Sequence, residues 1–153
     1  MATVQQFCTF YLDNLLLGVE VRQVQEVIQY QAMTRVPLAA AAIKGLINLR
    51  GQIVTAIDLR RQLQLPERAA GRPPMNIVIR TDEGAVSLLV DEIGAVLEVS
   101  AEQFEHPPAT LHGTARAMVR GVYKLKEQLL LILDTEKALA LDAIHNLQDL
   151  HKT

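Results

Sequence analysis

The most regular feature of the chain is an alternation of apolar and polar positions that is typical of β-strands. Cys8, Phe10 and Leu12 share one face of a predicted strand over 7–12, and Asp13-Asn14 then predicts a turn into a second strand over 15–21. Further apolar runs separated by turn residues predict hairpins and strand pairs along the chain. These are 46–49 with 53–57, 75–81 with 85–91, and 118–125 with 128–133.

Helical spacing occurs in two places. Val21, Val24, Val27 and Ile28 recur at intervals of three and four residues, which predicts a short helix or helical turn. Near the end, Asp134 is suited to cap a helix that carries an apolar stripe, so we expect a C-terminal helix over 134–151. The stripe consists of Leu141, Ile144, Leu147 and Leu150.

The chain also contains an internal repeat. Residues 44–59 align without gaps on residues 120–135, and the order of 18–27 matches that of 87–96. The paired positions of the first match include Gly45 with Gly121, Leu49 with Leu125, and Asp58 with Asp134. The alternative explanation is that hairpins of similar pattern arise from composition alone. A duplication explains the ungapped match better.

Each copy supplies about five short strands and a helical turn, which suits a small barrel that closes its own edges. We therefore expect a mainly β fold of two small barrels within one domain over 1–153. The approximate halves are 12–72 for the first barrel and 73–133 for the second, with exchange of strands between them. A linker rich in proline and glycine, 65–74, separates the halves.

Composition and charge narrow the classes of partner. Half of the 153 residues are hydrophobic, and a formal charge of −2 provides no general field for attracting nucleic acid or an acidic membrane. No apolar run approaches the roughly 20 residues of a membrane span, so we expect no direct membrane insertion. The single cysteine excludes an internal disulfide, and a cytoplasmic setting is expected.

The residues that usually carry catalysis do not form recognisable constellations. Ser87 and Ser100 lie outside any nucleophile elbow, and Cys8 falls on an apolar strand face, where a core residue is expected. The four histidines lack the spacing of metal-ligand pairs, and no glycine-rich loop ends in the Lys-Ser/Thr of a phosphate site. We therefore expect no enzyme activity, no metal and no cofactor.

A central block differs between the two copies. The first copy has Asn48, Leu49, Arg50 and Gly51 where the second has Lys124 to Glu127, so the turn glycine and its neighbours belong to one copy only. Such asymmetry is where a function specific to one half is expected.

This block and the residues around it resemble the CheW family of bacterial chemosensory coupling proteins, over nearly the whole chain. The matching segments of the first half are Val24-Gln25-Glu26-Val27, Val36-Pro37, Ile43-Lys44-Gly45, Asn48-Leu49-Arg50-Gly51, Ile53-Val54 and Asp58-Leu59-Arg60. The resemblance continues through Val90-Asp91 with Val96, Ala101-Glu102-Gln103, and Arg120-Gly121-Val122 leading to residues 130–134. The resemblance implies two interlocked five-stranded SH3-like barrels. It also implies a non-enzymatic adaptor that joins the cytoplasmic tips of methyl-accepting chemoreceptors to the regulatory domain of a CheA-type histidine kinase, located with membrane receptor arrays through these partners.

The resemblance further implies contacts for individual residues. Receptor contact would involve Val24 and its neighbour Val27 with Gly45 and Gly121, beside a structural ion pair between Glu26 and Arg50. The partner-binding set also includes Asn48, Leu49 and Gly51 of the asymmetric turn, and Glu92, which stands where many members carry glycine. Core packing is the alternative role for the two valines, and turn geometry for the three glycines.

Other interpretations remain at this point. A CheW-like adaptor of a paralogous pathway, controlling twitching, development or a second messenger, has the same sequence features. A small-ligand or nucleic-acid-binding β-barrel module is a different class, and the near-neutral charge disfavours the nucleic-acid form.

Overall fold

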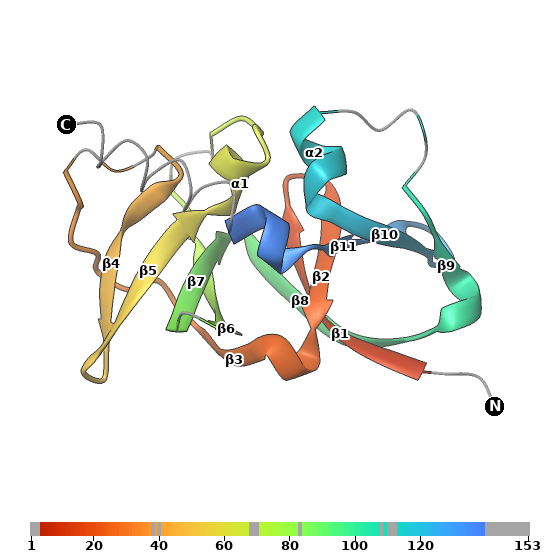
Figure 1. Ribbon diagram of the computed structural model, residues 1–153, viewed down its shortest axis with the longest axis horizontal. Coiled ribbons are helices and arrows are strands. Elements are labelled where there is room, and N and C mark those ends of the chain that lie inside the picture. Colours follow the sequence, from red (N-terminus) through yellow and green to blue (C-terminus); the bar gives the residue numbers. More distant parts are fainter. Residues whose placement is uncertain are drawn as a thin grey trace.

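Two β-sheets stand side by side and account for most of the described chain (Figure 1). The computed structural model describes residues 4–37, 39, 41–67, 71–82, 84–107, 109 and 113–139. One sheet has six strands in the order β8-β1-β2-β11-β10-β9, and the other has five in the order β3-β6-β7-β5-β4. The mainly β, two-sheet architecture predicted from the sequence is therefore confirmed.

The strands are short, and brief helical turns join them. The six-stranded sheet contains β1 (Val4–Leu12), β2 (Leu15–Glu20), β8 (Glu92–Ser100), β9 (Phe104–Glu105), β10 (Val119–Lys124) and β11 (Leu129–Leu133). The five-stranded sheet contains β3 (Val24–Ile28), β4 (Ile43–Leu49), β5 (Gln52–Asp58), β6 (Met75–Thr81) and β7 (Gly84–Val90). The turns are η1 (Val21–Gln23), α1 (Leu59–Gln62), η2 (Ala101–Gln103) and α2 (Gly113–Met118). Residues 135–139 are helical, and the rest of the predicted C-terminal helix lies outside the described residues.

Both sheets follow one pairing order, which agrees with the internal repeat. In each, an antiparallel hairpin (β1–β2 or β6–β7) is joined through a parallel pair (β2–β11 or β7–β5) to a second hairpin (β11–β10 or β5–β4). A further strand, β8 or β3, pairs with the first hairpin. The five-stranded sheet takes three strands from before the linker and two from after it, so the two halves of the chain contribute to both sheets.

A single apolar cluster, here called the shared core, lies between the sheets. It contains Phe10, Leu12, Leu17 and Val19 from one sheet and Ile57, Ile77, Ile79, Leu88 and Val90 from the other. Each sheet also has a cluster of its own, to which the neighbouring residues point. Thus Leu17 enters the shared core and Leu16 the six-stranded sheet's cluster, while Leu88 and Leu89 divide in the same way. Burial on both faces explains why these strands are apolar runs rather than alternating ones.

The helical prediction for 21–28 is wrong beyond Gln23. One 3₁₀ turn, η1, spans Val21–Gln23, and the chain then continues as β3, paired with β6. The register of this pair shifts between Val24 and Glu26, which moves later apolar residues one position along. That bulge produces a spacing that mimics a helix, although Val and Ile favour strands.

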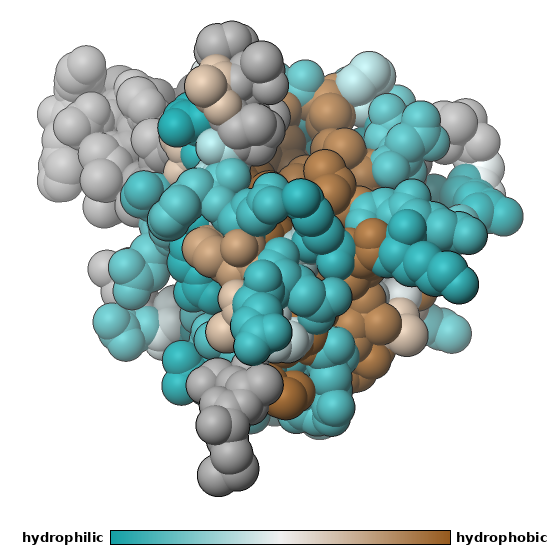
Figure 2. Space-filling model, turned by 90° about the vertical axis from the view of Figure 1, so that its right-hand side faces the viewer, coloured by the Kyte–Doolittle hydropathy of each residue, from teal (hydrophilic) through white to brown (hydrophobic). Residues whose placement is uncertain are grey.

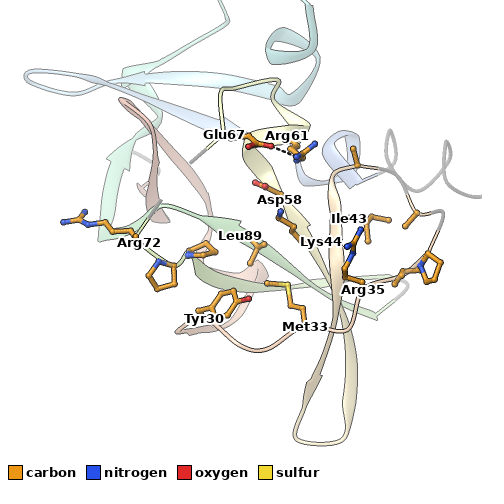
Figure 3. A pocket seen from close by; sticks show the side chains of 17 residues that line it. Tyr30, Met33, Arg35, Ile43, Lys44, Asp58, Arg61, Glu67, Arg72 and Leu89 are labelled. Carbon is orange, nitrogen blue, oxygen red and sulfur yellow. Dashed lines mark hydrogen bonds and ion pairs between the residues drawn. The ribbon is translucent and has the colours of Figure 1, made fainter. Parts of the chain in front are cut away.

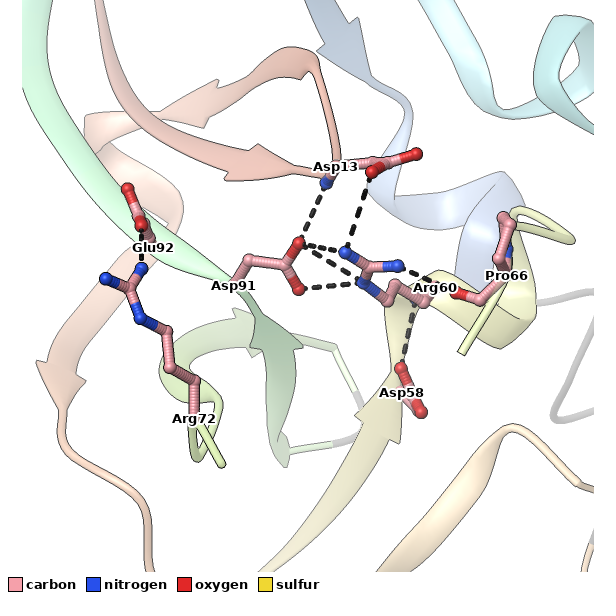
Figure 4. A network of polar contacts seen from close by, with 7 residues as sticks. All are labelled: Asp13, Asp58, Arg60, Pro66, Arg72, Asp91 and Glu92. Atoms are coloured by element: carbon pink, nitrogen blue, oxygen red, sulfur yellow. Dashed lines mark hydrogen bonds and ion pairs between the residues drawn. The ribbon is translucent and has the colours of Figure 1, made fainter. Parts of the chain in front are cut away.

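Arg60 connects the turns of the two sheets (Figure 4). Its guanidinium donates from Nε to Asp91 Oδ1 at 2.9 Å and from Nη1 to the Pro66 carbonyl at 2.7 Å, and it lies 4.0 Å from Asp13 Oδ1. Asp91 Oδ2 also accepts from the Asp13 backbone N–H at 2.8 Å. Asp13 belongs to the β1–β2 turn and Asp91 to the β7–β8 connection, so this network joins the sheets at the end of the shared core. The carboxylate of Asp91 raises the pKa of Arg60, which opposes the effect of burial.

We expect Arg60→Ala to lower the free energy of unfolding by about 1.5–3 kcal/mol, the range for hydrogen bonds to charged groups. The side chain of Arg60 is only 10% exposed, so water replaces its bonds to Asp91 poorly. Urea denaturation measures the change. The matched control is Arg61→Ala, which removes an exposed ion pair with Glu67 and is expected to change stability by roughly 0.5 kcal/mol or less. Equal effects of the two variants would contradict a connecting role for Arg60.

Candidate partner-binding surfaces

The asymmetric block of the sequence forms the tight β4–β5 turn. Arg50 and Gly51 both have positive φ, 52° and 89°, and Leu49 pairs with Gln52 across them. Positive φ at both central residues is the feature of a type I′ turn, whose backbone twist matches the right-handed twist of the two flanking strands. The Asn48 side chain accepts a hydrogen bond from the Gly51 N–H at 2.9 Å, which holds the turn closed.

The turn presents Arg50 to Glu26 of β3. The Arg50 guanidinium donates a hydrogen bond to the Glu26 carboxylate. Because β3 and β4 are opposite edges of the five-stranded sheet, this pair and the Thr34–Leu46 bridge join the two edges into a barrel. The hydrogen bond from Arg50 lowers the pKa of Glu26, and desolvation of the carboxylate opposes it.

Gly45 and Gly121 occupy equivalent places where another segment crosses their strand. A Cβ on Gly45 would lie 2.6 Å from the Thr34 carbonyl oxygen, and one on Gly121 would lie 2.0 Å from the Phe104 ring. The register of each hairpin also shifts at its glycine. Both glycines are buried. Close packing of the segment that closes each barrel therefore explains the two glycines at aligned positions of the repeat.

The structure brings some of the predicted contact residues together and separates others. Glu26 and Val27 of β3 lie beside the turn that carries Asn48 and Gly51, through the Glu26–Arg50 pair. Leu49 is buried and Val24 is half-buried against the shared core. Glu92 begins β8 and is paired with Arg72 at 2.6 Å, and Gly121 belongs to β10 of the other sheet.

Sequence reasoning named Val27 as a contact residue but missed three further exposed apolar side chains, Ile53, Val96 and Leu129, which are related to it or to each other by the repeat. Val27 and Ile53, here called the first apolar pair, are 40% and 63% exposed on the five-stranded sheet. Their repeat-related counterparts, Val96 and Leu129, are the second apolar pair, 57% and 52% exposed on the six-stranded sheet. The alignment of the repeat was the signal that would have found them. Each sheet therefore exposes two large aliphatic side chains that a partner could cover.

The second apolar pair has an apolar neighbour. Leu15 precedes Leu16, the partner of Leu130 in the parallel β2–β11 pair, so Leu15 and Leu129 start adjacent strands. Figure 2, which views the side formed by the six-stranded sheet, shows apolar surface as a band between hydrophilic side chains. This side therefore offers an apolar surface with a polar border, the composition of a protein–protein interface.

The described residues hold no cluster of three or more histidine, cysteine or acidic side chains that would ligate a metal ion. Cys8 is half-buried against the shared core, and burial raises the pKa of its thiol, which disfavours the reactive thiolate. Within the described part of the chain, no helix has the length and apolar character needed to cross a membrane.

The fold is a pair of small β-barrels that share one core, and comparison with known proteins identifies the family. The model of the CheW-like domain matches residues 6–143, so the chain belongs to the CheW family. It is 33% identical over 136 residues to the chemotaxis protein CheW of Klebsiella aerogenes, covering 89% of this chain and 82% of that protein. It is 26% identical over 149 residues to that of Treponema pallidum, covering 95% and 88%.

A solved structure agrees with this assignment. The crystal structure of the scaffolding protein TtCheW from Thermoanaerobacter tengcongensis superposes with a TM-score of 0.78 at 25% identity, covering 86% of this chain and 90% of that one. The chain is therefore a non-enzymatic scaffold of the CheW type, as the sequence predicted.

We expect Gly45→Ala to lower the free energy of unfolding by about 1–3 kcal/mol, as overpacking does. The added methyl group meets backbone, the Thr34 carbonyl, which moves only if the barrel closure shifts. Thermal or urea unfolding measures this, with the exposed neighbour Lys44→Ala as control, expected within roughly 0.5 kcal/mol of wild type. If Gly45→Ala leaves the free energy of unfolding unchanged, the segment around Thr34 moves aside without cost and the close contact does not require glycine.

The Glu26–Arg50 pair predicts a pH dependence of stability. Because the pKa of Glu26 is lowered in the folded state, its contribution is present above the unfolded value of about 4.3 and is lost as pH falls through the folded value. The difference in unfolding free energy between wild type and Arg50→Gln should therefore shrink between pH 7 and pH 3. Lys126→Gln, in the equivalent turn of the other sheet, serves as the control. A constant difference for Arg50→Gln across this range would show that the pair contributes nothing.

Proposed function

We propose that this chain couples the cytoplasmic tips of chemoreceptors to the regulatory domain of a CheA-type histidine kinase. Membership of the CheW family supports this role. The observation that carries it is an exposed apolar pair at repeat-related positions on each of two sheets, Val27 with Ile53 and Val96 with Leu129. A body with two such surfaces binds two partners at once. Its association with membrane receptor arrays follows from the receptor contact.

We assign the receptor tip to the surface around the first apolar pair. This surface includes the β4–β5 turn, with Asn48 and Gly51, and lies beside Val24, whose half-buried side chain packs against the shared core. A helical receptor tip would place its apolar stripe on Val27 and Ile53. The Glu26–Arg50 pair fixes the position of the turn relative to β3. Gly45 acts on this surface indirectly, since it permits the closure of the barrel beneath it.

The kinase regulatory domain is assigned to the second apolar pair. Val96 and Leu129, with Leu15 beside Leu129, supply aliphatic area on the six-stranded sheet. Gly121 supports the adjacent barrel closure by admitting the Phe104 ring, and Glu92 stands at the start of β8. Binding in a repeated array would add strength to each contact through multivalency.

Two aspartate substitutions test this assignment. Ile53→Asp should weaken binding of a receptor-tip fragment about tenfold or more, corresponding to about 1.4 kcal/mol, and leave the affinity for the kinase regulatory domain unchanged. Leu129→Asp should have the opposite selectivity. Both side chains are more than half exposed, so the fold is expected to survive, and calorimetric titration measures each affinity.

Gln64→Asp is the control, because it adds the same charge at an exposed position outside both surfaces and should leave both affinities unchanged. If each of Ile53→Asp and Leu129→Asp weakened binding of both partners, or of neither, the assignment of one partner to each sheet would be contradicted. Failure of the wild-type chain to bind either partner at about 100 μM would contradict the coupling function itself.

A further inference from the structure

A cavity of about 1120 Å³ opens beside the five-stranded sheet (Figure 3), and no residue of either apolar pair lines it. Met33 and Leu89, which belong to this sheet's own apolar cluster, line its inner part, and Tyr30 and Val36 line it with 47% and 38% of their surface exposed. The cavity therefore combines one partly exposed apolar side chain on its floor, Met33, with an accessible aromatic and aliphatic wall.

The charged residues that line this cavity carry an excess of positive charge. Four are cations, and the acidic ones are Asp58 and Glu67. Glu67 is paired with Arg61 at 2.5 Å, and Asp58 is nearly buried and accepts from the Arg60 backbone N–H at 3.1 Å. Arg72 is paired with Glu92 outside the lining.

Arg35 and Lys44 remain as exposed cations of the cavity whose side chains form no ion pair with a described residue. Neither has a hydrogen bond or ion pair with any residue in the part of the chain that the structure describes. Long cationic side chains at the edge of an apolar hollow attract an anionic group, and the apolar floor adds affinity for aliphatic side chains.

We propose that this cavity binds an extended acidic segment of a partner protein, with carboxylates on Arg35 and Lys44 and apolar side chains against Met33 and Tyr30. Size favours a peptide over a small anion, because the volume exceeds the roughly 300–1,000 Å³ of ordinary small-molecule pockets.

The test uses neither receptor nor kinase, so its outcome is independent of the proposed coupling function. The probe is a fluorescein-labelled peptide of about ten residues, rich in Glu with interspersed Leu, and binding is followed by fluorescence anisotropy. Wild type should bind with a Kd of roughly 100 μM or tighter. The Arg35→Gln/Lys44→Gln double variant should bind at least tenfold more weakly, and its thermal unfolding should match that of wild type.

Lys126→Gln removes an exposed cation from the β10–β11 turn, outside the cavity, and should leave the affinity unchanged. A peptide with Gln for every Glu should bind at least tenfold more weakly to wild type. Equal affinities of the double variant and wild type, or of the Glu and Gln peptides, would overturn the proposal. So would an absence of binding at about 1 mM peptide, or displacement of the peptide by a few millimolar inorganic phosphate, which would indicate a small-anion site.

Discussion

The shared core is the constraint on which the rest of the molecule depends. Its residues come from both sheets, and strands such as β2 and β7 bury one face there and the other in their own sheet's cluster. Each fully buried aliphatic side chain contributes about 1.5–3 kcal/mol. Separating the two sheets would therefore expose the inner faces of both to water. The polar contacts at its end, from Arg60 to Asp91 and Asp13, lie where the turns of the two sheets meet.

This constraint gives the scaffold its two fixed surfaces. The repeat places Val27 and Ile53 on one sheet and Val96 and Leu129 on the other, and the shared core holds the sheets together. Barrel closure then fixes the local shape of each surface. The Glu26–Arg50 pair and the close approach of Thr34 to Gly45 act on the first, and the Phe104 ring against Gly121 acts on the second. Function of this kind requires a stable arrangement and no reactive side chain.

Much of the fold follows from local signals in the sequence. The Arg50-Gly51 turn, the Asp13-Asn14 turn and the repeat at an offset of 76 predicted the hairpins and the two-sheet architecture. The stretch 21–28 misled, because a register shift against β6 depends on a partner strand that is distant in sequence. The reason for Gly45 and Gly121 also lies in long-range contacts with Thr34 and Phe104. Whether Ile53 and Leu129 are exposed depends on which face of their strand points into the barrel, and this is decided by distant strands. From the sequence alone, only their aligned positions in the repeat single them out.

Native-state hydrogen exchange of the backbone amides in β2 and β7 measures whether the two sheets unfold as one unit, since each strand packs into the shared core. The most protected amides of both strands should exchange with the same free energy, within about 1 kcal/mol, and this value should equal the free energy of global unfolding. Exchange of one sheet at a clearly lower free energy, with the other still protected, would show that the two barrels unfold independently and that the core does not join them.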